Sequence, residues 1–134
     1  SWAICRRRII PVIETLYKWL PRIFGCHRRP DRSFYLKGRQ FPICARCTGE
    51  LAGIILGVLL FGFYRPKVLV LCVLLLPLII DGSIQLTTKY ESTNLRRLFT
   101  GILFGYALVT LFFLSTNYVF EYGNRIGIKY FATI

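Results

Sequence analysis

The sequence predicts an all-α membrane protein, in which three transmembrane helices follow an amphipathic interfacial helix and a basic loop that contains Cys and His residues. Three observations favour this fold class: 54% of the 134 residues are hydrophobic, three long stretches are almost free of charge, and the formal net charge is +12. A chain this short cannot enclose so many apolar side chains in one water-soluble core, and a chain this apolar is not intrinsically disordered. We therefore expect a single membrane domain that covers residues 1–134.

Residues 1–24 are expected to form the interfacial helix. Its apolar side chains recur at helical spacing: Ile9, Ile13, Leu16, Tyr17 and Leu20. The charged residues lie largely on its other faces. Pro11 suits the first turn of this helix, and Pro21 helps to end it.

Residues 25–42 are expected to form a basic loop. The helical periodicity stops here, and glycine and proline recur: Gly25, Pro30, Gly38 and Pro42. The loop therefore separates the interfacial helix from the first apolar stretch.

The three apolar stretches that follow are expected to be transmembrane helices, at residues 43–64, 68–88 and 94–120. The last contains 23 consecutive uncharged residues, Leu98–Phe120, which reach about 34 Å at ~1.5 Å per residue. The first two have shorter charge-free cores and reach spanning length only by continuing through polar residues, so on length alone they also fit helices of a soluble bundle. Residues 121–134 are expected to form an external tail.

The distribution of positive charge predicts the orientation in the membrane. In a three-span arrangement, 14 of the 18 Lys and Arg residues lie on the side of the N-terminal region. Because basic residues are enriched on the cytoplasmic side, the N-terminus is expected in the cytoplasm and the C-terminus outside. We expect a multi-pass protein of the cell inner (cytoplasmic) membrane. Its expected partners are a bilayer with anionic headgroups and, as a further option, other membrane subunits, but no nucleic acid.

Small residues predict how the helices pack. Glycines recur every four residues on two of the expected spans: Gly49, Gly53 and Gly57, then Gly101 and Gly105. This spacing lets helix backbones approach closely in lipid, and we assign these glycines no chemical role.

Four potential metal ligands surround the start of the first expected span, in the pattern C-H-x16-C-x2-C: Cys26, His27, Cys44 and Cys47. Two Cys residues at this spacing at a helix start can bind one tetrahedral ion, and the preceding loop can supply the remaining ligands. Zinc is the favoured metal, and a water or a carboxylate can replace Cys26 or His27. Two alternatives stay open: thiol–disulfide exchange, which the expected cytoplasmic location opposes, and cysteines that are only small buried apolar residues.

A second polar group lies near the cytoplasmic ends of the last two expected spans: Asp81, Gln85, Asn94 and Arg97. Asp81 and Gln85 are four residues apart and share a helix face. An unpaired ionisable residue is costly at membrane depth, so Asp81 is expected to pair with Arg97 or Arg96, or to bind a ligand. Two interpretations follow: an ion pair that locks two helices together, or a pocket for an anionic ligand such as a lipid phosphate.

Two segments carry a family resemblance: residues 26–34, CHRRPDRSF, and residues 41–49, FPICARCTG. With Gly38 between them, they resemble the domain of unknown function 2085 family of small predicted membrane proteins. Later residues also fit its pattern: Asp81, Gly82, Gln85, Ser92, Asn94, Arg97 and Gly101. The sequence departs from the family at Glu50 and Leu51, where an apolar-aromatic pair is expected. The resemblance implies a membrane location and an important Cys and His cluster, and it brings no activity.

The sequence supports three hypotheses about function. The leading one is a small polytopic membrane protein whose cytoplasmic face carries a zinc site beside the polar pocket, which binds an anionic or lipid-phosphate ligand. The second is a membrane-embedded metal- or thiol-dependent enzyme in which Asp81 is a general base. The third is an accessory subunit of a larger membrane complex.

Overall fold

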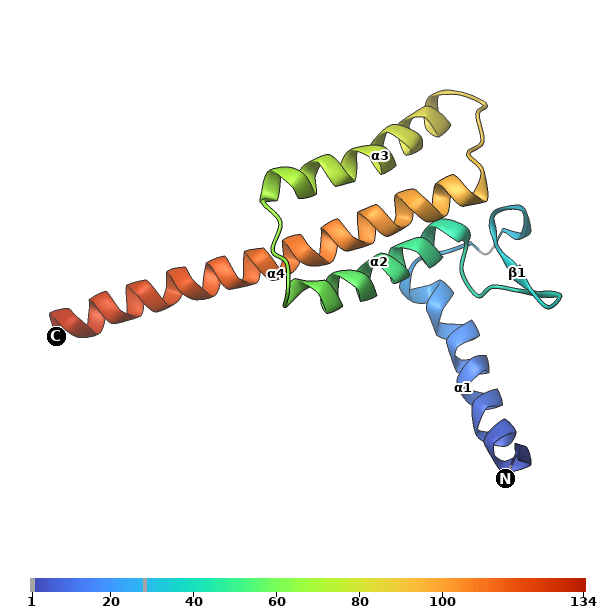
Figure 1. The fold of residues 1–134 in the computed structure, drawn as a ribbon, viewed down its shortest axis with the longest axis horizontal. Coiled ribbons are helices and arrows are strands. Elements are labelled where there is room, and N and C mark those ends of the chain that lie inside the picture. Colours follow the sequence, from blue (N-terminus) through green and yellow to red (C-terminus); the bar gives the residue numbers. More distant parts are fainter. Residues whose placement is uncertain (1, 28) are drawn as a thin grey trace.

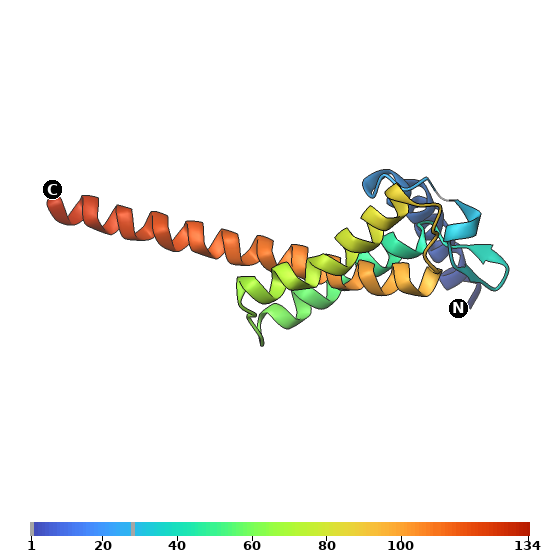
Figure 2. The same cartoon turned by 90° about the horizontal axis from the view of Figure 1, so that it is seen from above.

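The chain is almost entirely helical, which confirms the expected all-α class. The computed structural model describes residues 2–27 and 29–134, and in these residues four α-helices follow one another: α1 (Trp2–Ile23), α2 (Ala45–Phe61), α3 (Val68–Thr87) and α4 (Asn94–Thr133). Helices α2, α3 and α4 lie side by side, and α1 points away from them (Figure 1). The segment between α1 and α2 lies at the end of the bundle where α4 begins (Figure 2).

Helix α1 has nearly the expected bounds of residues 1–24, but Pro11 does not lie in its first turn. Because it starts at Trp2, both Pro11 and Pro21 lie inside it, so the expected place of Pro11 in the first turn is wrong. Proline fixes φ at a helical value, and the helix therefore continues through each ring at the cost of one backbone hydrogen bond. Several apolar side chains of α1 are exposed: Val12, Ile13, Leu16, Trp19 and Ile23. An exposed apolar face agrees with an amphipathic helix that lies on another surface.

The basic loop contains regular structure that the sequence analysis missed. A short 3-10 helix, η1 (Pro30–Arg32), precedes a hairpin of β1 (Tyr35–Leu36) and β2 (Arg39–Gln40). The two strands are antiparallel, with Leu36 opposite Arg39. Lys37 and Gly38 join them with φ values of 50° and 79°, the left-handed geometry of the tightest hairpin turns. The Tyr17 hydroxyl donates a hydrogen bond to the Gln40 carbonyl at 2.9 Å and so ties α1 to this hairpin.

Within the part of the chain that the structure describes, two helices, not three, are long and apolar enough to cross a membrane by length and composition: α3, with 20 residues, and α4, with 40. The expectation of three such helices is wrong for α2, which has 17 residues and reaches about 25 Å. The helix is shorter than the expected residues 43–64 at both ends: Cys44 is extended, with φ −68° and ψ 167°, and the last helical residue is Phe61.

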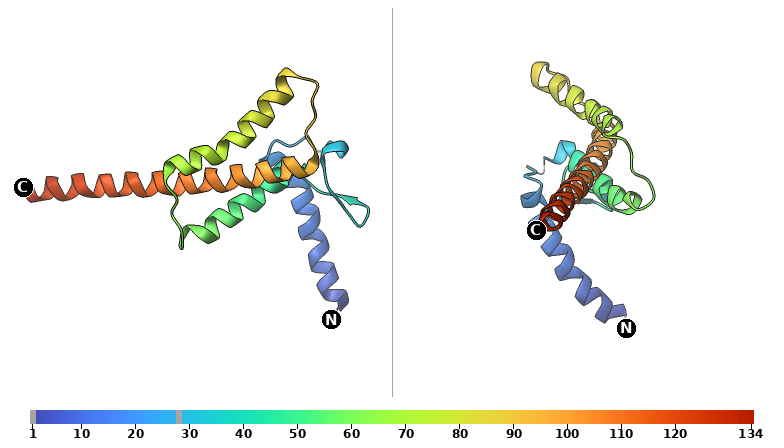
Figure 3. Two further views of the ribbon diagram at one scale, coloured as in Figure 1. Left: turned by 45° about the horizontal axis from the view of Figure 1, so that its top comes forward. Right: turned by 90° about the vertical axis from the view of Figure 1, so that its left-hand side faces the viewer.

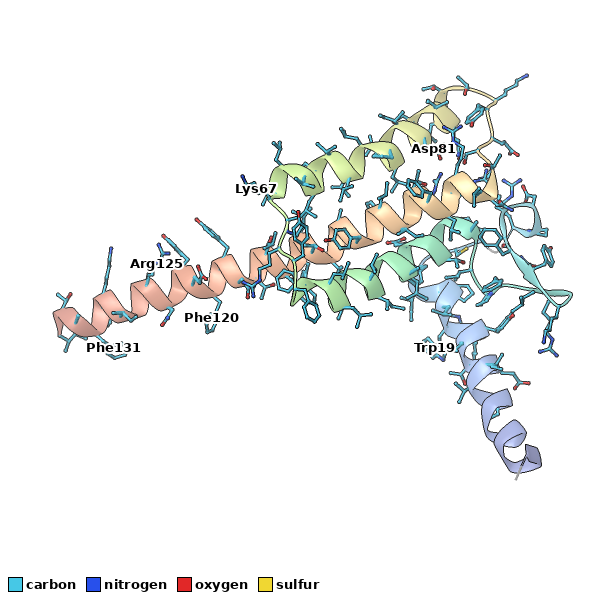
Figure 4. All side chains as sticks on the ribbon, in the orientation of Figure 1. Trp19, Lys67, Asp81, Phe120, Arg125 and Phe131 are labelled. Carbon is cyan, nitrogen blue, oxygen red and sulfur yellow. The ribbon has the colours of Figure 1, made fainter. Side chains whose placement is uncertain are left out.

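Helix α4 does not end near Phe120 but continues to Thr133, so the expected tail is helical. No proline interrupts this stretch, and glycine alone is tolerated inside a helix. The last turns of α4 project beyond the other helices, and the side chains of Phe120, Arg125 and Phe131 extend from it into open space (Figure 4). The compartment of this segment remains a prediction.

The expected glycine packing is confirmed at the interface of α2 and α4, which run parallel to each other. A Cβ on Gly49 would lie 3.0 Å from the carbonyl carbon of Leu98, and one on Gly105 would lie 2.9 Å from that of Glu50. Both distances are shorter than an ordinary van der Waals contact, so neither position accepts a larger residue without movement of the backbones. The interface therefore aligns the start of α2 with the start of α4. Helix α3 runs antiparallel to α2 and α4. Toward the C-terminal end of α3, the distance between α3 and α4 increases (Figure 3).

Candidate functional site

Three cysteines from two segments meet at the start of α2. The Sγ atoms of Cys26, Cys44 and Cys47 all lie within 4.8 Å of one another. The Sγ atoms of Cys44 and Cys47 are 3.4 Å apart, and the Cys44 backbone N–H donates a hydrogen bond to the Cys26 Sγ at 3.2 Å. The structure thus brings together three of the four residues that the sequence proposes as metal ligands.

The local sequence explains this convergence. Cys44 precedes the first turn of α2 and Cys47 lies within it, so both face the same side at a spacing of three residues. Cys26 reaches them because α1 ends in a reversal at Gly25, whose φ is +58°. The Cys26 N–H donates to the Pro21 carbonyl at 2.8 Å and the Gly25 N–H to that of Arg22 at 3.4 Å, the pattern of a Schellman motif. Glycine is suited to this position because it adopts positive φ without steric cost.

His27 lies beside the three cysteines without joining them. It lines the same cavity of about 200 Å³, which Phe24, Arg29 and Arg32 also help to form. Among the described residues, the group of potential ligand atoms within mutual reach consists of the three sulfurs, and no ring nitrogen of His27 belongs to it. The role of His27 as a ligand therefore stays a prediction.

The donor set fits a soft metal ion. With Zn–S distances of ~2.3 Å, two sulfurs of one tetrahedral site are about 3.8 Å apart, and the observed sulfurs need only small movements to reach that spacing. The hydrogen bond with the Cys47 thiol lowers the pKa of Cys44 to about 5, against the opposing effect of burial. The same hydrogen bond, together with burial, raises the pKa of Cys47. Since a metal ligand must be a thiolate, Cys44 would bind an ion first and Cys47 would release its proton on binding.

Asp81 pairs with an arginine that the sequence analysis did not propose. The Arg46 Nη2 donates to the Asp81 Oδ2 at 2.8 Å, whereas the expected pairing with Arg97 or Arg96 is wrong. The physical reason is the parallel alignment of α2 and α4, which brings the first turn of α2 to the end of the bundle where α3 ends. Arg46 stands between Cys44 and Cys47, so it links the cysteine cluster to the polar group on α3.

The other residues of the expected polar pocket form one hydrogen-bonded chain with Asp81. The Gln85 Nε2 donates to the Asp81 Oδ2 at 3.1 Å and to the Ser92 Oγ at 2.6 Å. The Arg97 Nε donates to the same Ser92 Oγ at 3.1 Å, and its Nη1 donates to the Asn94 Oδ1 at 3.4 Å. Ser92 is the central acceptor that the sequence analysis left out of the pocket. Asp81 and Arg97 are each only 5% exposed, which makes this chain the buried polar part of the bundle.

Comparison with known sequences places this site in a family. Residues 26–111, which run from Cys26 through the polar chain into α4, match the family described as predicted membrane protein (DUF2085). The chain belongs to the DUF2085 family. Both the cysteine cluster and the polar chain of this member lie inside the matched region.

Two archaeal relatives of this DUF2085 protein are themselves described as uncharacterised. A protein of Methanothermobacter thermautotrophicus is 39% identical over 92 residues, which is 64% of this chain and 82% of the relative. A protein of Methanocaldococcus jannaschii is 34% identical over 91 residues, which is 63% of this chain. The aligned region spans 58% of the Methanocaldococcus jannaschii protein. No solved structure matches the chain at a significant level.

Proposed function

We propose that this DUF2085 protein is a multi-pass membrane protein that binds one zinc ion through Cys26, Cys44 and Cys47, beside a polar site for an anionic ligand. The observation that carries the proposal is the placement of three sulfurs within 4.8 Å of one another. Three thiolates are a typical zinc donor set, and His27 or a water completes the tetrahedron. The bound ion would hold the segment after α1 against the start of α2.

The outward side chains support a lipid environment. The surfaces of α2 and α3 expose large apolar residues along their length: Ile55, Leu59, Leu69, Val73, Leu76 and Ile80. Extended apolar surfaces of this kind are rare on monomeric soluble proteins. Since α2 packs along α4 through glycines, it enters the bilayer with α4, and its 17 residues lie at the short limit for a crossing helix.

The basic residues support one orientation in a cytoplasmic membrane. The loop before α2, the start of α2, the connection between α3 and α4 and the start of α4 lie at the same end of the bundle. Together with α1, which joins the bundle at this end, they contain 14 of the 18 Lys and Arg residues. The positive-inside rule then assigns this end, with the cysteine cluster, to the cytoplasm. The projecting C-terminal part of α4 would lie outside.

Elemental analysis of the purified protein tests the zinc site. The wild-type chain, after chelation and reloading with zinc, should retain about one ion per chain, and Cys44→Ala should retain almost none. Cys72→Ala is the matched control, because Cys72 is exposed on α3 and belongs to no ligand cluster among the described residues. A wild-type protein that takes up no zinc, or a Cys44→Ala variant that binds it as tightly as the wild type, would refute the site.

A thiol redox role is a second candidate that one observation favours. Cys44 and Cys47 are 3.4 Å apart, and the low pKa of Cys44 makes it a thiolate at neutral pH, as in C-x2-C oxidoreductases. Mass measurement of the zinc-free protein after mild oxidation distinguishes the two functions. A readily reversible Cys44–Cys47 disulfide in a wild-type protein that never binds zinc would favour redox chemistry.

A further inference from the structure

Three arginines from three segments converge beside the polar chain, and each has a buried N–H without an acceptor. Among the described residues, the Nε atoms of Arg32 and Arg46 and the Nη2 of Arg97 are buried and make no hydrogen bond. Arg32 belongs to η1, Arg46 to α2 and Arg97 to α4. The charges of Arg32 and Arg46 are near enough to act on Arg97. The fold therefore concentrates positive charge at one buried place.

Arg97 is the most unusual of the three. It is only 5% exposed, and its partners among the described residues are the neutral side chains of Ser92 and Asn94, not a carboxylate. The carboxylates of Glu91 and Asp31 act on Arg97 only from a distance. A buried charge that no counter-charge contacts is costly, and a buried donor without an acceptor adds to that cost. Proteins retain such groups where a ligand supplies the missing charge and acceptors.

A cavity of about 420 Å³ opens next to this arginine cluster. Its polar lining comes from the loop, from α2, and from the end of α3 and the connection to α4: Arg32, Arg46, Gln85, Lys89, Tyr90 and Glu91. Three of these residues are basic and one is acidic, so the cavity favours an anion. It is distinct from the larger apolar groove between α3 and α4, which has a volume of about 720 Å³.

Glu91 forms an ion pair with Arg32 at the edge of this cavity. The Arg32 Nη2 donates to the Glu91 Oε1 at 3.1 Å, and Arg32 also approaches Asp31 at 3.8 Å. The side chain of Glu91 is 63% exposed, so its carboxylate can leave without disturbing a packed core. The Glu91 Oε1 therefore lies where an oxygen of a bound anion would accept the hydrogen bond from Arg32.

We propose that this cavity binds a phosphate monoester, with the phosphate oxygens held by Arg32 and Arg46 and displacing Glu91 from Arg32. The guanidinium fork matches phosphate geometry, and two arginines with Lys89 suit an anion of charge near −2. Arg97 contributes positive charge from behind the cavity wall. This site deepens the proposed polar site for an anionic ligand, and it places that ligand on Arg32 and Lys89 as well as on Arg46. The phosphate comes either from a soluble compound or from a lipid headgroup such as phosphatidate.

Phosphate binding to the full chain in detergent micelles tests the site. Titration with inorganic phosphate, followed by calorimetry or phosphorus NMR, should give saturable binding to the wild type and at least about a tenfold weaker affinity for Arg32→Gln, which removes a charged bidentate donor. Arg32→Lys should recover part of the affinity, which separates loss of charge from loss of folding. Arg125→Gln, on the projecting part of α4, removes the same charge far from the cavity and should bind as the wild type does.

Glu91→Gln should increase the affinity for phosphate, because it removes the carboxylate that competes for Arg32. Removal of the competing carboxylate should tighten phosphate binding by up to about fivefold, the range for one exposed ion pair. An unchanged or weaker affinity would refute the displacement of Glu91. Equal affinities of the wild type and Arg32→Gln would overturn the phosphate site.

Lipid nanodiscs distinguish the two sources of phosphate, a soluble compound and a lipid headgroup. In nanodiscs of phosphatidylcholine with a minor fraction of phosphatidate, saturable phosphatidate binding that depends on Arg32 indicates the headgroup, whereas binding of inorganic phosphate alone indicates a soluble ligand. Binding of neither would overturn the proposal. Zinc content measured on the same samples keeps this result separate from the metal site, since either site can fail while the other remains.

Discussion

Replacement of Gly105 by alanine should destabilise the bundle, because it inserts a methyl group where two helix backbones meet. A Cβ at this position would lie 2.9 Å from the carbonyl carbon of Glu50 and 3.0 Å from its Cα. Ordinary contact begins at 3.4 Å, so α2 and α4 must separate by at least about 0.5 Å. Backbone cannot rotate away as a side chain can, and overpacking of this kind costs roughly 1–3 kcal/mol.

The same substitution at Gly127 is the matched control. Gly127 lies on the projecting part of α4, and a Cβ there would meet nothing within 4 Å. Since alanine is the better helix former by about 0.5–1 kcal/mol, Gly127→Ala should stabilise or leave the protein unchanged. Both variants replace a glycine of α4 with alanine. Gly105→Ala should lower the free energy of unfolding, whereas Gly127→Ala should raise it or leave it unchanged.

Reversible unfolding in mixed micelles, followed by far-UV circular dichroism, measures the free energy of unfolding of each variant. Gly105→Ala should unfold at a lower denaturant fraction than the wild type, and Gly127→Ala at the same or a higher one. If Gly105→Ala were as stable as Gly127→Ala, the close contact between α2 and α4 would not exist.

Two further predictions concern the ion pair and the orientation. Asp81→Ala should lower the free energy of unfolding by about 1–3 kcal/mol, less than for a fully buried pair because the Arg46 side chain is 30% exposed. Asp81→Asn keeps the acceptor for Gln85 and should lose less, and equal losses in the two variants would show that the hydrogen bond from Gln85 to Asp81 contributes nothing to stability. Reporter fusions at the two termini should report the N-terminus in the cytoplasm and the C-terminus outside, and two signals from the same compartment would contradict the proposed orientation.

The local features of this protein could be read from the sequence. The uncharged run Leu98–Phe120 predicts a long apolar helix, and glycines at every fourth position predict a close helix interface. The proximity of Cys44 and Cys47 follows from the start of a helix, where the side chain of the residue before the first turn lies near the third helical residue. These inferences succeed because residues three or four apart meet on any helix, whatever surrounds it.

Three of the four residues that the sequence proposes as metal ligands lie together, as expected, and the position of the fourth depends on the path of the loop. Cys26 needs the chain to reverse at Gly25, and this glycine did predict a loop. His27 follows Cys26 directly and lines the cavity, yet it lies outside the sulfur cluster. Adjacent residues point in different directions, so only the path of the loop decides which of the two faces the other cysteines.

Only the tertiary structure decided the contacts between elements. Arg97 and Arg46 are both basic residues near a helix start, and the sequence favoured Arg97 as the partner of Asp81, whereas the structure pairs Asp81 with Arg46. The choice depends on how α2 and α4 are rotated about their axes, which the glycine interface sets, and on how far α3 diverges from α4. Ser92 becomes the central acceptor for the same reason, since a connection between helices is positioned by the helices that it joins. Sequence periodicity shows which face of a helix is apolar, but it contains no information on which neighbour that face meets.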